Sequence, residues 1–236
     1  MTDLDFTYAN RTGRGPGRIV RALGLVAPGV RRVRGQAEPY AEAWRARNLR
    51  ALGQPGRRWF VLGDSMSQSV GATAYDAGWV DQLADRLSTT ALLSVVNLSA
   101  TGARVPDVVH QQVPWLGRIG VGPDDLVTVL VGSNDLFGGR AHSAMLPTAF
   151  GDLLDRIPPG TVVATLPQPR TAAELANAQI EAAAAAGRVR VVDMRTAGPS
   201  SWRGKLAGDW FHPNDDGYAA IADAFEPVVR QALESD

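Results

Sequence analysis

Three short polar segments, far apart in the chain, carry side chains that can act together in catalysis. They are Gly63-Asp64-Ser65, Gly132-Ser133-Asn134-Asp135 and Asp209-Trp210-Phe211-His212. A serine hydroxyl is a weak nucleophile at neutral pH until an imidazole accepts its proton, and the imidazole works best when a carboxylate orients it. Ser65, His212 and Asp209 can fill these three roles. The residue types therefore indicate a serine nucleophile that attacks a carbonyl carbon.

Asn134 adds a group that this chemistry needs. The oxygen of an attacked carbonyl gains negative charge, and preorganised hydrogen-bond donors stabilise it, each by roughly 2.7–4 kcal/mol in mutational tests on other enzymes. A side-chain amide is a neutral donor, so Asn134 would not compete for the proton that His212 must carry. The set therefore predicts a serine hydrolase.

Each segment also has an ordinary structural interpretation. Gly-Asp-Ser is a common turn tripeptide, and Asn-Asp after a strand is ordinary turn chemistry. The segment 209–212 could simply precede a helix whose N-cap is Asn214 or Asp215. The catalytic interpretation rests on the combination of the three segments and on the elements around them.

From residue 59 onward, apolar runs alternate with helical stretches, which is the pattern of βα units around a parallel sheet. The expected strands are 59–62, 94–98, 126–131, 161–165 and 189–192. The expected helices are 78–88, 105–112, 143–156, 172–186 and 217–233. We therefore predict the α/β class, as a three-layer α/β/α sandwich with a five-stranded parallel sheet.

The polar segments fall where such a fold places a ligand site. In an open parallel sheet, ligands bind beyond the carboxyl ends of the strands. Segment 63–65 follows the first expected strand, 99–102 follows the second and 132–134 follows the third. His212 must then arrive from the loop before the last helix.

These segments resemble the SGNH hydrolases, also called GDSL-type esterases and lipases, over residues 59 to about 230. The four residues that give that family its letters correspond in order to Ser65, Gly102, Asn134 and His212. Met66 stands where the family's name-giving tetrapeptide has leucine, and it keeps an apolar side chain. The Gly-x-Ser-x-Gly signature of another serine-hydrolase class is absent because Ser67 occupies the second glycine position.

The resemblance implies a flavodoxin-like SGNH hydrolase fold, a set of roles and an activity. Ser65 would be the nucleophile, His212 the general base and then acid, and Asp209 the residue that orients the imidazole. Ser65 N–H, Gly102 N–H and the Asn134 amide would form the oxyanion hole, Gly102 allowing close approach because it lacks a Cβ. The implied activity is hydrolysis of carboxylic esters through an acyl-enzyme. Acyl transfer, thioester hydrolysis and removal of O-acetyl groups from carbohydrates use the same mechanism and stay open.

Side chains beside the motifs are candidates for contact with a small-molecule ester substrate. They are Met66, Arg104, Leu136, Phe137 and Trp210. Apolar walls suit an acyl chain, and a guanidinium such as that of Arg104 recognises carboxylate or phosphate. The aromatic members could instead belong to the core, and the acyl length and the alcohol stay open.

Composition limits the other classes of site. A chain of 236 residues that is 45% hydrophobic is large enough for one catalytic domain, which we place at residues 59–236. The absence of cysteine excludes disulfides, thiolate nucleophiles and cysteine-based metal sites. The three histidines are dispersed and no metal-binding motif occurs. We therefore expect no metal and no cofactor.

Residues 1–58 form a basic N-terminal arm, with twelve arginines against four acidic residues. Its arginines flank an apolar patch at 19–26, so weak contact with an anionic membrane surface is one interpretation, and no nucleic acid is expected. The other interpretation is that the arm packs on the acidic body, with a helix at 40–52 that turns Tyr40, Trp44, Asn48 and Leu52 inward. The polar Asn48 weakens that stripe. A non-catalytic binding module that uses this arm is the hypothesis from another class.

Two features bear on location. No stretch approaches the roughly 18 apolar residues of a membrane helix, and the first residues lack the basic and apolar regions of a signal peptide. We therefore expect a cytoplasmic protein, and the oligomeric state stays open.

Overall fold

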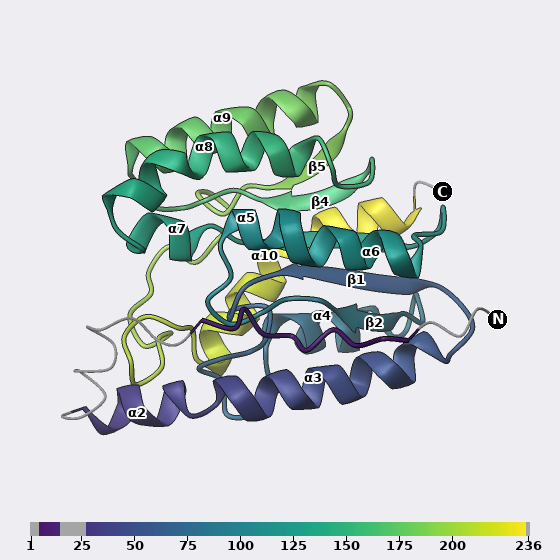
Figure 1. Ribbon diagram of the computed structural model, residues 1–236, viewed down its shortest axis with the longest axis horizontal. Helices are drawn as coiled ribbons and strands as arrows, with labels where there is room; N and C mark the ends of the chain where they lie inside the picture. Colours follow the sequence, from purple (N-terminus) through teal and green to yellow (C-terminus); the bar gives the residue numbers. More distant parts are fainter. Residues whose placement is uncertain (1–4, 15–26, 235–236) are drawn as a thin grey trace.

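A parallel sheet of five strands, in the order β2-β1-β3-β4-β5, forms the centre of the computed structural model, which describes residues 5–14 and 27–234 (Figure 1). The strands are β1 (Arg58–Gly63), β2 (Ser94–Asn97), β3 (Leu126–Leu130), β4 (Thr161–Ala164) and β5 (Val189–Val192). Each neighbouring pair is parallel. The strand order is that of flavodoxin-like folds, and the predicted five-stranded parallel sheet is confirmed.

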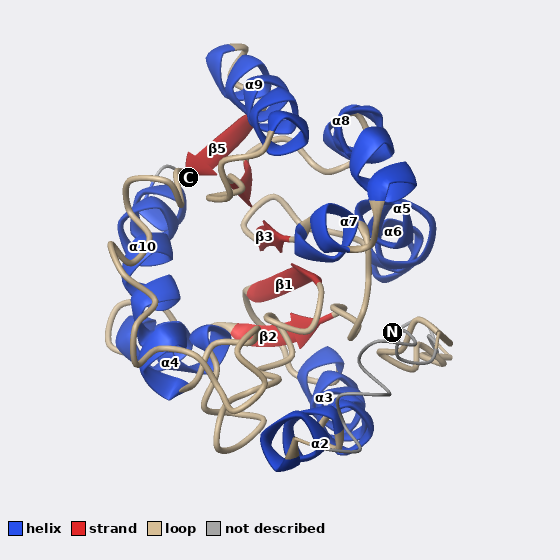
Figure 2. Cartoon of the chain, turned by 90° about the vertical axis from the view of Figure 1, so that its left-hand side faces the viewer, coloured by secondary structure: helices blue, strands red, loops and turns tan. Residues whose placement is uncertain are grey.

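Helices cover both faces of the sheet, which confirms the predicted three-layer sandwich. Figure 2 shows α4 (Trp79–Leu87) and α10 (Asp215–Glu234) on one side and α5 (Val105–Asp107), α6 (Val113–Ile119) and α8 (Arg140–Leu154) on the other. The short helix α7 (Ser133–Phe137) follows β3, and α9 (Thr171–Ala185) packs beside α8. Helices α2 (Pro28–Arg34) and α3 (Ala37–Leu52) precede the sheet, and α3 packs against the edge strand β2.

Strand β1 shows why an apolar run of this kind forms the middle of the sheet. Its side chains alternate between faces, so that Trp59 and Val61 join the core under α4 and α10, whereas Phe60 and Leu62 join the core on the opposite face. All four are fully buried. The rings of Trp79 and Phe225 stack at 4.3 Å between α4 and α10 and close the first of these cores.

The helix predicted at 105–112 is longer and less regular than expected. A π-helical turn at Val108–Gln112 joins α5 to α6 without a break, with Val113 N–H donating to Val108 O, and Pro114 lies at the start of α6, where this turn accommodates a residue without N–H. The π turn aims the buried Gln112 at β1. Its side chain accepts from Gly63 N–H and donates to Gly63 O, both at 2.8 Å. Gln112 thus continues the backbone pairing of β1 at the point where the strand ends.

Residues 5–14 run beside β2 and the loop that follows it. The rings of Phe6 and Tyr8 contact Trp115 of α6 at 5.3 and 6.0 Å, and Tyr8 Oη donates to Leu98 O at 2.7 Å. The apolar patch at 19–26, on which the predicted membrane contact depends, lies outside the described residues. Within the described ranges, no helix is long and apolar enough to cross a membrane.

Candidate active site

Ser65, His212 and Asp209 lie in one hydrogen-bonded chain, although 147 residues separate the first two. Ser65 Oγ is 2.9 Å from His212 Nε2, and His212 Nδ1 is 2.6 Å from Asp209 Oδ2. Ser65 is only 3% exposed. This geometry lets His212 take the hydroxyl proton while Asp209 holds the ring in the required tautomer.

Ser65 stands in a tight turn directly after β1. Val70 N–H donates to Ser65 O at 3.0 Å, and Met66 N–H donates to Asp64 Oδ1 at 2.9 Å. Asp64 is 2% exposed, and this burial raises the pKa of its carboxyl to about 6, against the opposing effects of the Met66 N–H and of His212. The Asp64 carboxyl therefore holds the backbone that places Ser65.

Asp209 holds the loop of His212 as well as its ring. Its Oδ1 accepts the backbone N–H of Phe211 at 3.2 Å and that of His212 at 3.0 Å. Burial acts to raise the pKa of Asp209, but the hydrogen bonds and charge of His212 outweigh it and leave the pKa below its ordinary value. Asp209 is therefore suited to act as an ionised partner of the imidazole.

Three donors are available near the serine. Within the described part of the chain, the N–H groups of Ser65 and Gly102 have no hydrogen-bond acceptor. Asn134 Nδ2 donates to Ala103 O at 2.9 Å and lies 3.4 Å from Asp64 Oδ2. One amide hydrogen of Asn134 is used by Ala103 O. The other makes only the long contact with Asp64 Oδ2 and is therefore available to a ligand.

The backbone conformation of Gly102, as well as any close approach of a ligand, favours glycine. A Cβ there would meet only Thr12 Oγ1, at 3.9 Å, so space is available. Its φ of +77° lies in the left-handed region, which an L side chain disfavours. The backbone conformation, and not crowding, requires glycine.

The five candidate substrate contacts have different surroundings. Phe137 and Trp210 are 51% and 73% exposed, Met66 is half-buried, and Leu136 is 2% exposed within the core. Arg104 Nη1 lies 3.2 Å from His142 Nδ1. The two aromatic side chains are thus open to solvent, whereas Leu136 is buried and, together with Phe137, lines the end of a groove described below.

A row of rings leads away from the imidazole. Phe211 lies edge-on to His212 at 5.0 Å and to Phe137 at 5.6 Å. The guanidinium of Arg170 covers Phe137 at 4.7 Å and donates to Leu136 O at 3.2 Å. Arg170 lies in the loop after β4, directly before α9.

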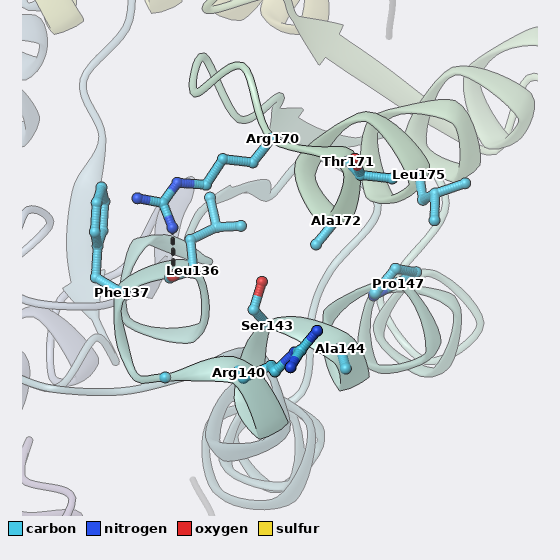
Figure 3. Close-up of a pocket in the computed structure, with 11 residues that line it drawn as sticks. Leu136, Phe137, Arg140, Ser143, Ala144, Pro147, Arg170, Thr171, Ala172 and Leu175 are labelled. Carbon is cyan, nitrogen blue, oxygen red and sulfur yellow. Dashed lines mark hydrogen bonds between the residues drawn. The ribbon is translucent and has the colours of Figure 1, made fainter.

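Beyond this row lies a groove of about 860 Å³ between α8 and the start of α9. Figure 3 shows Ser143 and Arg140 on one side of it and Ala172 and Leu175 on the other. Its walls are mainly apolar, with arginine at the rim. Sequence reasoning missed this groove because it arises where two helices pack together.

Sequence reasoning also missed a group of buried amide side chains behind the site, here called the amide cluster. Its members, each 0% exposed, are Asn10, Asn48, Gln68 and Asn97. Gln68 Nε2 donates to Ser99 O at 3.0 Å, and Asn97 Nδ2 donates to Ser67 O at 2.6 Å. Asn48 donates to Asn97 O at 2.7 Å and accepts its N–H at 2.8 Å. The amide cluster thus ties the Ser65 turn to the segment that contains Gly102, and Asn48 is one of its buried connections.

One further buried carboxyl lies close to the site. Asp135 is 2% exposed and its Oδ2 accepts Val105 N–H at 3.1 Å. Burial, together with the charge of Asp64, raises its pKa to about 7, despite the lowering effects of that hydrogen bond and of Arg104. Among the described residues, no group of three or more histidine and acidic side chains is arranged to hold a metal ion.

Several solved structures share this fold. A lipolytic protein of the G-D-S-L family from Veillonella parvula is 19% identical, with a TM-score of 0.57 over 75% of this chain and 100% of that one. TesA is 21% identical, with a TM-score of 0.60 over 75% and 100%. A family 3 carbohydrate esterase from Clostridium thermocellum is 19% identical, with a TM-score of 0.58 over 76% and 98%. At these identities the likeness establishes the fold.

The family follows from the sequence itself. No curated protein matches the chain significantly. The model of the GDSL-like lipase/acylhydrolase family matches residues 61–220, which include Ser65, Gly102, Asn134, Asp209 and His212. This span is more than half of the chain. It contains the end of β1 and all of the other four strands. The chain therefore belongs to the GDSL-like lipase/acylhydrolase family.

Proposed function

We propose that this protein hydrolyses small-molecule carboxylic esters through an acyl-enzyme on Ser65. The observation that carries the proposal is the continuous hydrogen-bonded chain from Ser65 Oγ through His212 to Asp209, at 2.9 and 2.6 Å. Membership of the lipase/acylhydrolase family supports the same reaction class.

The reaction begins when Ser65 Oγ attacks the ester carbonyl carbon and His212 Nε2 takes the hydroxyl proton. The C–O bond to the alcohol then breaks, and His212 returns the proton to the departing oxygen, which leaves an acyl group on Ser65. Water, deprotonated by His212, attacks this acyl group and releases the carboxylic acid, while the proton returns to Ser65 Oγ. Asp209 stabilises the protonated imidazole in both halves.

The oxyanion in this scheme is bound by Ser65 N–H, Gly102 N–H and the Asn134 amide. The two backbone donors have no acceptor within the described residues, and Asn134 has one weakly held hydrogen. Unused donors of this kind are what an oxyanion hole requires. Loss of the Asn134 donor should lower kcat by about 10²–10³-fold.

The groove between α8 and α9 is the place we assign to the acyl chain. Leu175, Pro147 and Ala172 give it apolar walls, and the rings of Phe211 and Phe137 connect it to His212. Its volume of about 860 Å³ lies within the range of sites for molecules of drug size. Esters with an extended acyl chain fit this arrangement better than acetates do.

The test is release of p-nitrophenol from esters that run from acetate to dodecanoate, measured for the wild type, Ser65→Ala and His212→Ala. Ser67→Ala and His110→Ala are matched controls, since Ser67 is in the same turn and His110 is exposed. Both triad variants should lose nearly all activity and both controls should keep it. A folded wild type that hydrolyses none of these esters would refute the proposed reaction.

A further inference from the structure

The N-terminal segment lies against the loop that carries Gly102. Asn10 Nδ2 donates to Asn97 O at 2.7 Å and to Ser99 O at 2.9 Å. Arg11 forms a parallel backbone bridge with Thr101. The segment therefore pairs, residue by residue, with the chain that leads from β2 into the proposed oxyanion hole.

The peptide whose N–H belongs to Gly102 is held on its opposite side by Thr12. Thr12 Oγ1 donates to Thr101 O at 3.3 Å. In a trans peptide the C=O and the following N–H point in opposite directions, so a carbonyl fixed toward Thr12 aims Gly102 N–H away from the arm. Gln68 Oε1 fixes the preceding peptide by accepting Thr101 N–H at 2.8 Å.

Arg14 holds the next peptide along. Its Nη2 donates to Gly102 O at 3.1 Å, and its guanidinium also forms a two-pronged ion pair with Asp107, in which Nη1 lies 2.8 Å from Oδ1. Asp107 in turn accepts Arg104 N–H at 2.7 Å. A forked guanidinium with this many contacts has a fixed orientation, so the carbonyl of Gly102 is fixed with it.

Gly102 depends on these contacts because it has few others. It has no side chain, its φ is +77°, and the nearest atom to a Cβ at this position would be Thr12 Oγ1, at 3.9 Å. A glycine so placed can reach many backbone conformations at small cost. Only one of them presents its N–H to the oxyanion.

We infer that Thr12 and Arg14, which lie outside the segment matched by the family model, are positioning residues that complete the oxyanion hole by fixing the two peptides around Gly102. The inference rests on the proposed function, in which Gly102 N–H binds the oxyanion. Two residues of the N-terminal arm thereby contribute to the reaction indirectly, through the position of Gly102.

A purely structural role for the arm makes a different prediction. Within residues 5–14, the buried apolar contacts are those of Phe6 and Tyr8, which are 4% and 6% exposed. Thr12 is half-buried and Arg14 is exposed, so shortening either side chain removes little packing. Loss of the Thr12 hydroxyl should therefore appear in turnover and not in thermal stability, whereas loss of Arg14 also leaves the largely buried Asp107 carboxylate without its guanidinium partner and should lower both.

The experiment compares Thr12→Val and Arg14→Ala in the full chain with the wild type, on the best p-nitrophenyl ester. Displacement of a donor by about 1 Å can cost about 10²-fold, so each variant should lower kcat by about 10–100-fold with KM nearly unchanged. The melting temperature should stay near the wild-type value in Thr12→Val and fall in Arg14→Ala, which leaves the buried Asp107 unpaired. Thr12→Ser, which keeps the hydroxyl, should restore activity. Binding of an alkylboronic acid, whose tetrahedral serine adduct places an oxygen in the oxyanion hole, should weaken by a similar factor.

Arg11→Ala is the matched control. The Arg11 side chain forms exposed ion pairs with Glu38 and Glu42 at 2.9 Å, which contribute little, and its backbone bridge survives the substitution. This variant should behave as wild type. Equal losses in Arg11→Ala, or wild-type kcat in both test variants while Ser65→Ala is inactive, would overturn the inference and leave the proposed function standing. A folded but inert wild type would overturn both.

Discussion

Both carboxylate oxygens of Asp209 are bound by His212, one by the ring and the other by the backbone. Oδ2 lies 2.6 Å from Nδ1, and Oδ1 accepts the backbone N–H at 3.0 Å. One side chain therefore sets the position of the imidazole, its tautomer and the fold of its loop.

Asp209→Asn should separate these functions. The asparagine oxygen can still accept the backbone N–H groups, so the melting temperature should change little. Its amide cannot supply the charge that stabilises the protonated ring, and kcat should fall by about 10³–10⁴-fold. Steady-state kinetics with thermal melts checks this, and Asp209→Ala, which loses both contacts, should also be less stable. An active Asp209→Asn enzyme would show that the carboxylate is dispensable.

Gly71→Ala should displace the imidazole. Gly71 has a φ of +105°, and a Cβ there would lie 2.8 Å from His212 Cβ and would collide with Pro213 O. We expect kcat to fall at least about tenfold. Gly56→Ala is the control, because its φ is +108° with nothing within 4 Å. Both variants should share the cost of a left-handed alanine, about 1–2 kcal/mol, and only Gly71→Ala should lose turnover.

Asp135→Asn should stabilise the protein increasingly as the pH rises. The native pKa of Asp135 is raised from 3.8 to about 7, so the native state holds this proton more tightly than the unfolded state does. The resulting stability is complete below the unfolded pKa and is lost as pH rises through about 7. At about pH 8 the wild type carries the full cost of ionisation, at most about 4 kcal/mol, and asparagine avoids it.

Urea unfolding at about pH 5 and about pH 8 tests this by comparing the two free energies of unfolding. The advantage of Asp135→Asn should be larger at the higher pH. Asp152→Asn, at an exposed position on α8, should show no such trend. An advantage that does not depend on pH would exclude titration of Asp135 as its source.

Ser143→Trp should shorten the acyl chain that the enzyme accepts. Ser143 lies in the groove at the first turn of α8 (Figure 3), and an indole there would fill space that a long chain needs. Hydrolysis of dodecanoate relative to acetate should fall by about tenfold or more. The ratio should stay near the wild-type value in Ser143→Ala. A Trp variant with an unchanged ratio would place the acyl chain elsewhere.

The parts of the fold with a strong local signal were predicted correctly. Strand β1 was expected at 59–62 and spans Arg58–Gly63. It could be predicted because a strand that is buried on both faces appears in the sequence as an unbroken run of apolar residues. Ser65, Asp209 and His212 were singled out by residue type and by the resemblance to the SGNH hydrolases, and they lie in one hydrogen-bonded chain; their catalytic roles stay predictions. By contrast, α7 was expected as a turn, since five residues after a glycine carry no helical periodicity.

The features that were missed depend on contacts between residues that are far apart in the sequence. Asn48 was expected to weaken the inward stripe of its helix, yet it is fully buried and hydrogen-bonded to Asn97, 49 residues away. The pairing of residues 10–14 with the Gly102 loop spans about 90 positions. A polar residue in a helix gives no sign of such a partner, because the partner is fixed only when the chain has folded.

The amide cluster also determines where this protein can be cut. A fragment that began at residue 59 would match the family's boundaries but would lack Asn10 and Asn48. Gln68 and Asn97 would lose those hydrogen-bond partners, and β2 would lose the packing of α3. Residues 5–14 and α3 therefore belong to the same folding unit as the sheet, and all of these parts should unfold in a single transition.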